Sequence, residues 1–273
     1  MHMNQIRPAA VAGAFYSGDA QILNRDLDLL LSQAQASKPS VHDPVPKALI
    51  VPHAGYLYSG PIAALAYRRL ATGRDKITRV VLLGPAHRVA VRGLALPQAQ
   101  AFATPLGQVR LDHAACAHLL DLKQVILSDA THAQEHSLEV QLPFLQKVLG
   151  DFALVPLVVG DASAAEVAQV LESVWGGAET LIVISSDLSH YLPYAQAQRI
   201  DQHTSNMILN LQTGISHDQA CGSAPVNGLL LAAKQHGLKP ELLDLRNSGD
   251  TAGHPDKVVG YAAFVFMEQT HAD

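Results

Sequence analysis

The chain has 273 residues, of which 48% are hydrophobic and 16% are charged, so its apolar content suffices for the core of one large α/β domain. The formal net charge is −5 without any run of lysine and arginine, which excludes a nucleic-acid backbone as main partner because phosphate contacts need clustered cations. The apolar stretches have strand length, which excludes a membrane span. With two distant cysteines and no pattern of a secretory signal, we expect a cytoplasmic location.

Strands and helices are predicted to alternate along the chain. Helices are expected at 19–35, 60–72, 112–123, 137–149 with a kink at Pro143, 163–175, 196–212 and 224–237. Strands are expected at 47–53, 79–87, 91–97, 152–160, 180–187, 240–250 and 258–267, and 104–112 is expected to be a turn that leads into a strand. Asp19 and Asp112 are predicted N-caps, and Pro61 is placed in the first turn of its helix. The proline-rich stretch 37–47 is expected to be an extended connector. This order predicts an α/β fold: one domain, residues 1–273, whose largely parallel or mixed central sheet carries helices on both faces.

Polar side chains follow three of the predicted strands. LIVPH ends on His53, VVLLGPAH ends on His87, and LIVISSDLSH places Asp187 and His190 after a third strand. Ligands of open α/β sheets bind outside the carboxyl ends of the strands, and adjacent parallel strands are about 4.8 Å apart. Imidazoles from adjacent strand ends therefore reach one ion at the usual metal–nitrogen distance of about 2.0–2.1 Å. One such histidine would be an ordinary loop residue, but three equivalent positions favour a site.

Two further features near these strand ends have more than one interpretation. Tyr56 and Tyr58 either donate hydrogen bonds to a bound oxygen species or pack against the core. Cys221 directly precedes a predicted helix, whose N-terminus lowers the pKa of a thiol and so favours a thiolate that acts as metal ligand or nucleophile. The alternative for Cys221 is a buried structural cysteine.

The segment HAQEH, residues 132–136, matches the HxxEH zinc motif. The clear helical period begins only at Leu138, so we expect His132 to lie in a loop, the match to be fortuitous, and His136 alone to reach a pocket. Glu139 either orients His136 as a supporting carboxylate or caps the helix.

The segment SSDLSH, residues 185–190, pairs a carboxylate with a histidine. Asp187 is predicted to orient His190 and raise its basicity, which would make a general acid/base pair. The alternative is that Asp187 or Ser189 caps the next helix.

Seven motifs in order carry a resemblance to a known family. They are RPAAVAGAFYSG, PHAGYLYSG, LLGPAHR, EHSLEVQLPFL, ISSDLSHY, ACGSAPVNGLL, and NSGD followed by VVGYAAFVF. Together they run nearly from end to end, and the chain resembles the Memo family, specifically the bacterial and archaeal AmmeMemoRadiSam system protein B. Ser17 departs from the proline expected after Phe-Tyr, and this affects a loop only.

The resemblance implies a fold similar to the class III (LigB-like) extradiol dioxygenases, which are non-haem iron enzymes. By that resemblance His53 and His87 are metal ligands, Cys221 replaces the glutamate ligand of the dioxygenases, and His136, Asp187 and His190 line the same pocket as acid/base candidates. We expect Fe(II) first, with copper or zinc as alternatives because a thiolate softens the site.

A fold does not fix a function, so three functions stay open. The first is metal-dependent redox or oxygenase chemistry on an unknown small molecule. The second is a non-catalytic module that binds a peptide or a partner, and the resemblance implies a radical SAM protein and an Ammecr-type domain as partners. The third is a metal-free hydrolase in which His190 and Asp187 activate Cys221.

Overall fold

The computed structural model describes residues 6–34 and 44–269, so most of the connector predicted at 37–47 lies outside the described residues. The strands are β1 (Ile6–Arg7), β2 (Ala48–Val51), β3 (Arg79–Pro85), β4 (Leu94–Leu96), β5 (Ala101–Thr104), β6 (Gly107–Arg110), β7 (Val125–Leu127), β8 (Ala153–Val159), β9 (Thr180–Ser185), β10 (His190–Leu192), β11 (Lys239–Asn247) and β12 (Val258–Met267). The α-helices are α1 (Ala20–Gln33), α2 (Tyr56–Arg68), α3 (His113–Leu119), α4 (Asp129–Ala133), α5 (Leu142–Leu149), α6 (Ala164–Ser173), α7 (Tyr194–Leu209) and α8 (Ser223–Gln235). Short 3₁₀ turns are η1 (Ala71–Gly73), η2 (Glu139–Gln141) and η3 (Ser248–Asp250).

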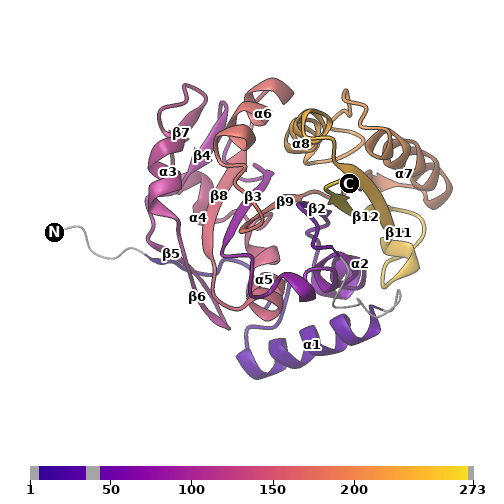
Figure 1. Ribbon diagram of the computed structural model, residues 1–273. Coiled ribbons are helices and arrows are strands. Elements are labelled where there is room, and N and C mark those ends of the chain that lie inside the picture. The colour runs from indigo at the N-terminus through magenta and orange to yellow at the C-terminus, as the bar shows by residue number, and fades with distance from the viewer. Residues whose placement is uncertain (1–5, 35–43, 270–273) are drawn as a thin grey trace.

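A nine-stranded mixed sheet forms the centre of the fold (Figure 1). Its strand order is β10-β12-β2-β9-β3-β8-β4-β7, and β11 also pairs with β12. The four central strands β2, β9, β3 and β8 are parallel, while β12 is antiparallel to β2 and β4 is antiparallel to β8. A small separate sheet contains β1, β5 and β6. The expected α/β fold with a mixed central sheet in one domain is confirmed.

Side chains that alternate along the strands build a hydrophobic core on each face of the sheet. Leu49 and Val51 of β2 belong to one core, together with residues of α1, α2 and α5, whereas Ala48 and Ile50 belong to the other, together with residues of α6 and α8. Figure 1 shows α1, α2 and α5 below the sheet and α6 and α8 above it. Because both faces are covered, the central strands read as nearly continuous apolar runs, as parallel strands do.

Several predicted element boundaries are confirmed and others differ from the structure. Asp19 caps α1 through the N–H groups of Gln21 and Ile22, and Asp112 caps α3. Helix α2 begins at Tyr56, so Pro61 lies inside it and not in its first turn. The helix expected over 137–149 is divided into η2 and α5, since Pro143 lacks an N–H and is best placed in the first turn of a new helix.

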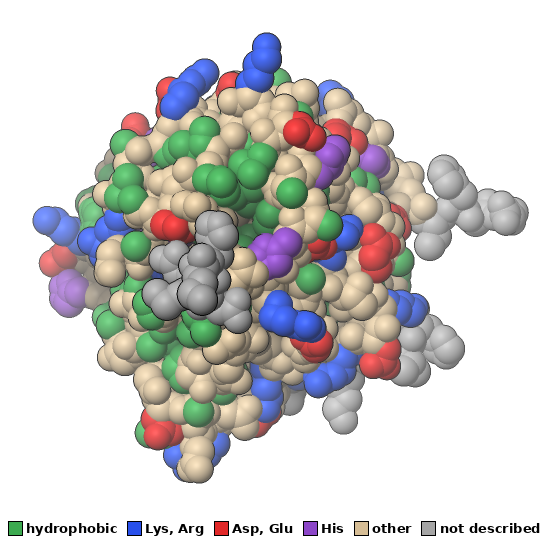
Figure 2. All heavy atoms as spheres, turned by 90° about the vertical axis from the view of Figure 1, so that its left-hand side faces the viewer, with side chains coloured by type: hydrophobic (Ala, Val, Ile, Leu, Met, Phe, Trp, Pro, Cys, Tyr) green, Lys and Arg blue, Asp and Glu red, His purple; other side chains and the backbone are tan. Residues whose placement is uncertain are grey.

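Acidic and basic side chains are interspersed over the face shown in Figure 2. Of the helices in the described part of the chain, none has the length and apolar content that a membrane crossing requires.

The segment that follows α4 packs directly onto β3 at Gly84. A Cβ atom at Gly84 would lie 2.7 Å from Ser137 Oγ and 3.0 Å from a methyl carbon of Leu138. Ser137 is fixed at this distance because its hydroxyl donates to the carbonyl of Pro85 at 2.9 Å. Residue 84 must therefore be glycine for the 136–138 segment to reach the end of β3.

A buried ion pair holds the same segment from its other side. Arg7 of β1 pairs with Glu139, and both side chains are buried. Arg7 also donates to the carbonyls of His132 and Glu135, at 3.0 and 2.6 Å. Glu139 in turn accepts hydrogen bonds from the N–H groups of Ala10 and Val11 and from the Tyr16 hydroxyl. We call this group of contacts the Arg7–Glu139 clamp.

Replacing Gly84 by alanine should lower the free energy of unfolding by about 1–3 kcal/mol, because the added methyl group forces Ser137 and Leu138 away from β3. Chemical denaturation monitored by circular dichroism measures the change. Gly18→Ala is the matched control, since a Cβ there would meet its nearest atom at an ordinary 3.4 Å. Equal stability of the two variants would contradict the packing argument.

Replacing Arg7 by methionine should destabilise the fold by about 3–5 kcal/mol, because Glu139 is left as an unpaired buried charge. Arg92→Met is the control: Arg92 pairs with Asp161 at the surface, where such a pair contributes about 0–1 kcal/mol. Urea denaturation of both variants checks this difference, and a loss at Arg7 no larger than that at Arg92 would refute the clamp.

Candidate metal site

Two histidines and an aspartate lie just beyond the carboxyl ends of three parallel strands. His53 follows β2, His87 follows β3 and Asp187 follows β9. We expected the two histidines on adjacent strands, but β9 lies between β2 and β3. The two imidazoles nevertheless meet over the end of β9, with ring centroids 5.2 Å apart. The expected clustering of these strand ends therefore occurs, across one intervening strand.

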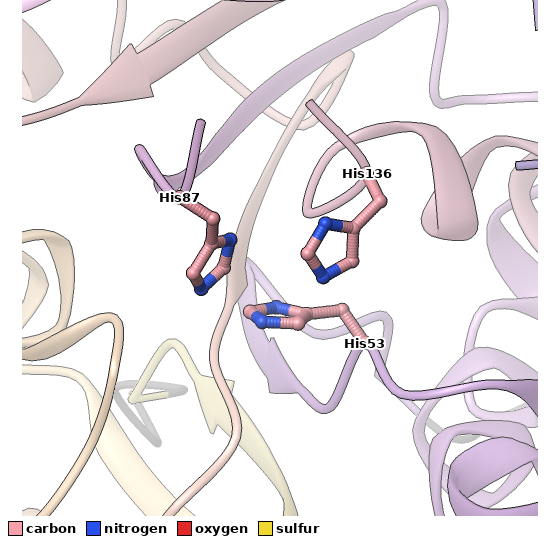
Figure 3. A group of neighbouring side chains, drawn as sticks. All are labelled: His53, His87 and His136. Carbon is pink, nitrogen blue, oxygen red and sulfur yellow. The ribbon is translucent and has the colours of Figure 1, made fainter. Parts of the chain in front are cut away.

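His136 completes a cluster of three imidazoles, which we call the histidine cluster. It lies between α4 and η2, on the segment that packs against Gly84. Its ring centroid is 5.5 Å from that of His53 and 4.7 Å from that of His87. Three ring nitrogens, one from each histidine, lie within 4.8 Å of one another, so a single ion fits among them. Figure 3 shows the three rings facing one another.

Hydrogen bonds fix the tautomer of His53, which is buried. Its Nδ1 lies 2.9 Å from Ser185 Oγ. The Ser185 hydroxyl donates its only proton to the carbonyl of Ser137 and accepts a hydrogen bond from Gln141 Nε2. Nδ1 of His53 must therefore be the donor, which leaves the lone pair on Nε2 free for a metal.

Glu135 orients His87 in the same way. Its carboxylate accepts from His87 Nδ1 at 2.9 Å and from the backbone N–H groups of His87, His136 and Ser137. Burial alone would raise the pKa of Glu135, but these hydrogen bonds from His87 and Ser137 lower it to about 2. The carboxylate is thus ionised and can only accept, so Nδ1 of His87 is the donor in their hydrogen bond.

The protonation state of two imidazoles, those of His53 and His136, also suits metal binding. Burial, with the neighbouring His87 and His136 rings, holds the pKa of His53 well below its ordinary value. Burial likewise lowers the pKa of His136 to about 4, although Glu135 opposes the shift. Nδ1 of His136 lies 3.4 Å from Glu135 Oε1 and makes no hydrogen bond to the described residues. Neutral nitrogen donors suit a cation, because metal-bound imidazoles are neutral.

Cys221 lies beside the histidine cluster. Its Sγ is 3.4 Å from His53 Nε2, and its residue is 8% exposed. Burial, and the nearby Asp187, raise the pKa of Cys221 to about 12, which is opposite to the lowering expected from the helix N-terminus. The helix it precedes, α8, begins at Ser223. The N-terminus of α8 would lower the pKa of the thiol, but the burial of the sulfur raises this pKa by more.

Asp187 contacts His53 and not His190. Its Oδ1 accepts from the backbone N–H of His53 at 2.7 Å, and burial raises its pKa to about 7 against the effect of that bond. Nδ1 of His190 instead lies 2.8 Å from the carbonyl of Leu188. The predicted Asp187–His190 pair is therefore wrong. The alternative of a helix cap is wrong too, because α7 begins after Pro193.

The remaining candidates lie away from the histidine cluster. Tyr56 donates its hydroxyl to the carbonyl of Val140 and packs in the core. His132 lies in α4 and not in a loop, but its Nε2 contacts the carbonyl of Ala95, so the HxxEH match does not form a zinc site. Glu139 belongs to the Arg7–Glu139 clamp, and its predicted role beside His136 is taken by Glu135. Glu135 was missed, although it is the glutamate of HAQEH itself.

The histidine cluster opens into a cavity of about 740 Å³, which we call the first cavity. His53, His87, His136, Asp187, His190 and Cys221 all line it. The structure thus brings the six predicted site residues to one cavity. Arg88, Tyr191, Gln196 and His217 also contribute to its wall.

Comparisons with known proteins agree with this architecture. A crystal structure of the uncharacterized protein JW3007 from Escherichia coli K12 has the same fold, with a TM-score of 0.53 and 13% identity over 80% of this chain and 98% of that chain. A MEMO1 family protein from Ignicoccus hospitalis is 37% identical over 96% of this chain and 98% of its own length. Another, from Aquifex aeolicus, is 35% identical over 96% of this chain and all of its own length. The model of the Memo-like protein family matches residues 7–265, and the chain therefore belongs to that family.

Proposed function

We propose that the protein holds one metal ion at the histidine cluster and uses it in redox or oxygenase chemistry on a small molecule. The observation that carries this proposal is the convergence of His53, His87 and His136 in the wall of the first cavity. Ser185 and Glu135 hold two of these imidazoles, those of His53 and His87, each through its Nδ1. A pocket of this kind, with a few convergent polar groups, is typical of a small-molecule site.

There are two candidate sets of three ligands. Both contain His53 and His87, and they differ in the third ligand. His136 is the third ligand that the distances favour. Cys221 is the third ligand that the resemblance to the dioxygenases implies, and its Sγ is near His53 Nε2. In the second case His136 is free to act as an acid or base on the substrate.

The donor set bears on the choice of metal. Three imidazoles suit iron, copper or zinc, and exchange of one imidazole for a thiolate favours softer ions. We propose Fe(II) first, with copper or zinc as alternatives. When bound, a redox-active ion would supply one-electron chemistry and open positions for ligands.

The protein's own groups bind the substrate and move its protons. His190 donates from Nδ1 to the Leu188 carbonyl, so its Nε2 is free to accept a proton from a molecule in the first cavity. Asp187 fixes the backbone at His53 and lines the same cavity. A radical SAM protein and an Ammecr-type domain stay predicted partners.

A metal-free hydrolase is the second candidate function, because Cys221 Sγ and His53 Nε2 are close enough to exchange a proton. The partner of the thiol would be His53, and not His190 as the sequence suggested. Iodoacetamide labelling of Cys221 separates the two functions. Rapid labelling that added metal does not slow would favour the hydrolase, whereas protection by metal favours the metal site.

Metal analysis of anaerobically purified protein tests the metal proposal. His53→Ala and His87→Ala should each lose the ion, because both candidate ligand sets require them. His136→Ala and Cys221→Ser identify the third ligand by which of them loses it. His236→Ala is the control, since His236 stacks on Trp175 and contacts Glu172 outside the cavity. Unchanged metal content in both His53→Ala and His87→Ala would refute the site.

Replacing Glu135 by alanine should weaken metal affinity about 10–100-fold, because His87 loses the carboxylate that orients its ring. Competition with a chelator measures the affinity. Glu172→Ala is the matched control, because Glu172 also pairs with a histidine, His236, but away from the first cavity. An affinity that both replacements change equally would contradict a role for Glu135 at the metal.

A further inference from the structure

A second cavity, of about 400 Å³, adjoins the first. Cys221 and His217 line both cavities, so the two share a wall beside the histidine cluster. The second cavity lies at the carboxyl ends of β3 and β8, where Pro85 and Val159 contribute to it, and at the first turn of α8. None of the roles proposed above uses this space.

The linings of the two cavities differ in chemistry. The first cavity has four histidines besides His217, and it also has Arg88, Asp187 and Asp218. The second is lined mainly by small apolar residues, among them Ala86, Ala90, Val91, Ala162, Ala224 and Pro225. Its one carboxylate, Asp161, is 85% exposed and pairs with Arg92 at 3.2 Å, so it faces water. The second cavity therefore offers apolar contact without a buried charge.

We propose that the second cavity binds the uncharged, apolar part of the substrate whose polar group lies at the histidine cluster. This inference rests on the proposed function, because it assumes that the reacting group is held there. The substrate class is then an amphipathic small molecule: a polar, metal-binding head in the first cavity and an aliphatic or aromatic tail that passes Cys221 and His217. An apolar tail gains free energy in this space by leaving water.

Ala224 and Ala162 determine the size of the tail. Ala224 lies in the first turn of α8 and Ala162 follows β8, and each contributes only a methyl group to the second cavity. Both are partly buried and pack against the core that includes α6 and α8, so a leucine at either position adds bulk at the wall of the second cavity. Neither residue lines the first cavity.

A homologous series of n-alkylhydroxamic acids, from acetohydroxamic to octanohydroxamic acid, tests the proposal. The hydroxamate is a metal-binding head, and the chain length is the only variable. Titration calorimetry on the metal-loaded and the metal-free protein measures each affinity. We expect affinity to rise roughly fourfold per methylene group until the cavity is full. Ala224→Leu and Ala162→Leu should abolish the rise and leave acetohydroxamate binding unchanged. Ala117→Leu, on the exposed side of α3, should retain it.

The outcomes distinguish this inference from the proposed function. Affinity that does not depend on chain length, a rise that survives both leucine variants, or failure of octanohydroxamate to bind either form of the protein would overturn the second cavity as a tail site. Acetohydroxamate affinity that is the same with and without metal would instead count against the metal site. Because the leucine variants lie at two separate positions, misfolding of one leaves the other to decide.

Discussion

The ion pair between Arg7 and Glu139 is the interaction on which the histidine cluster depends most. The sheet places His53 and His87 by itself, because each follows the end of a parallel strand. His136 and Glu135 have no such support, since they lie between α4 and η2. The Arg7–Glu139 clamp fixes this segment from the side of the N-terminal residues, and the contact of Ser137 with Gly84 fixes it from the side of the sheet.

The polar groups around the cluster form a connected network that sets where protons lie. Tyr67 donates to Gln141, Gln141 donates to Ser185 and to the carbonyl of Pro52, and Ser185 donates to the carbonyl of Ser137. Each donor in this chain is used, so the orientation of one hydroxyl proton at Ser185 decides which nitrogen of His53 carries its proton. Satisfied buried networks of this kind hold a single arrangement, which a metal site requires.

The sequence predicts the parts of the site that follow from strand periodicity. His53, His87 and Asp187 were found because each comes directly after an apolar strand, and parallel strands end at one edge of a sheet. The order of the strands was not predictable, and so the position of β9 between β2 and β3 was missed. That order is set by long-range pairing, for which local pattern carries no signal.

The contacts of the carboxylates were the least predictable feature. Spacing placed Glu139 beside His136 and Asp187 beside His190, whereas the fold gives Glu139 to Arg7 and Asp187 to the backbone of His53. In both cases the true partner is remote in sequence. The effect of the helix N-terminus on Cys221 was overestimated for a related reason, since burial depends on the whole fold.

The pairing of β2 with β12 has a consequence for the order of events during synthesis. Strand β2, which ends just before His53, lies between β9 and the C-terminal strand β12. Its hydrogen bonds to β12 can form only once the ribosome has made residues 258–267, and such distant pairings are slow to close. Strand β2, and with it His53, thus waits without its final neighbour until β12 has been made, whereas β3 pairs with β8 and β9 before that. If the histidine cluster holds an ion, the complete site for it would form only after β12 has been made.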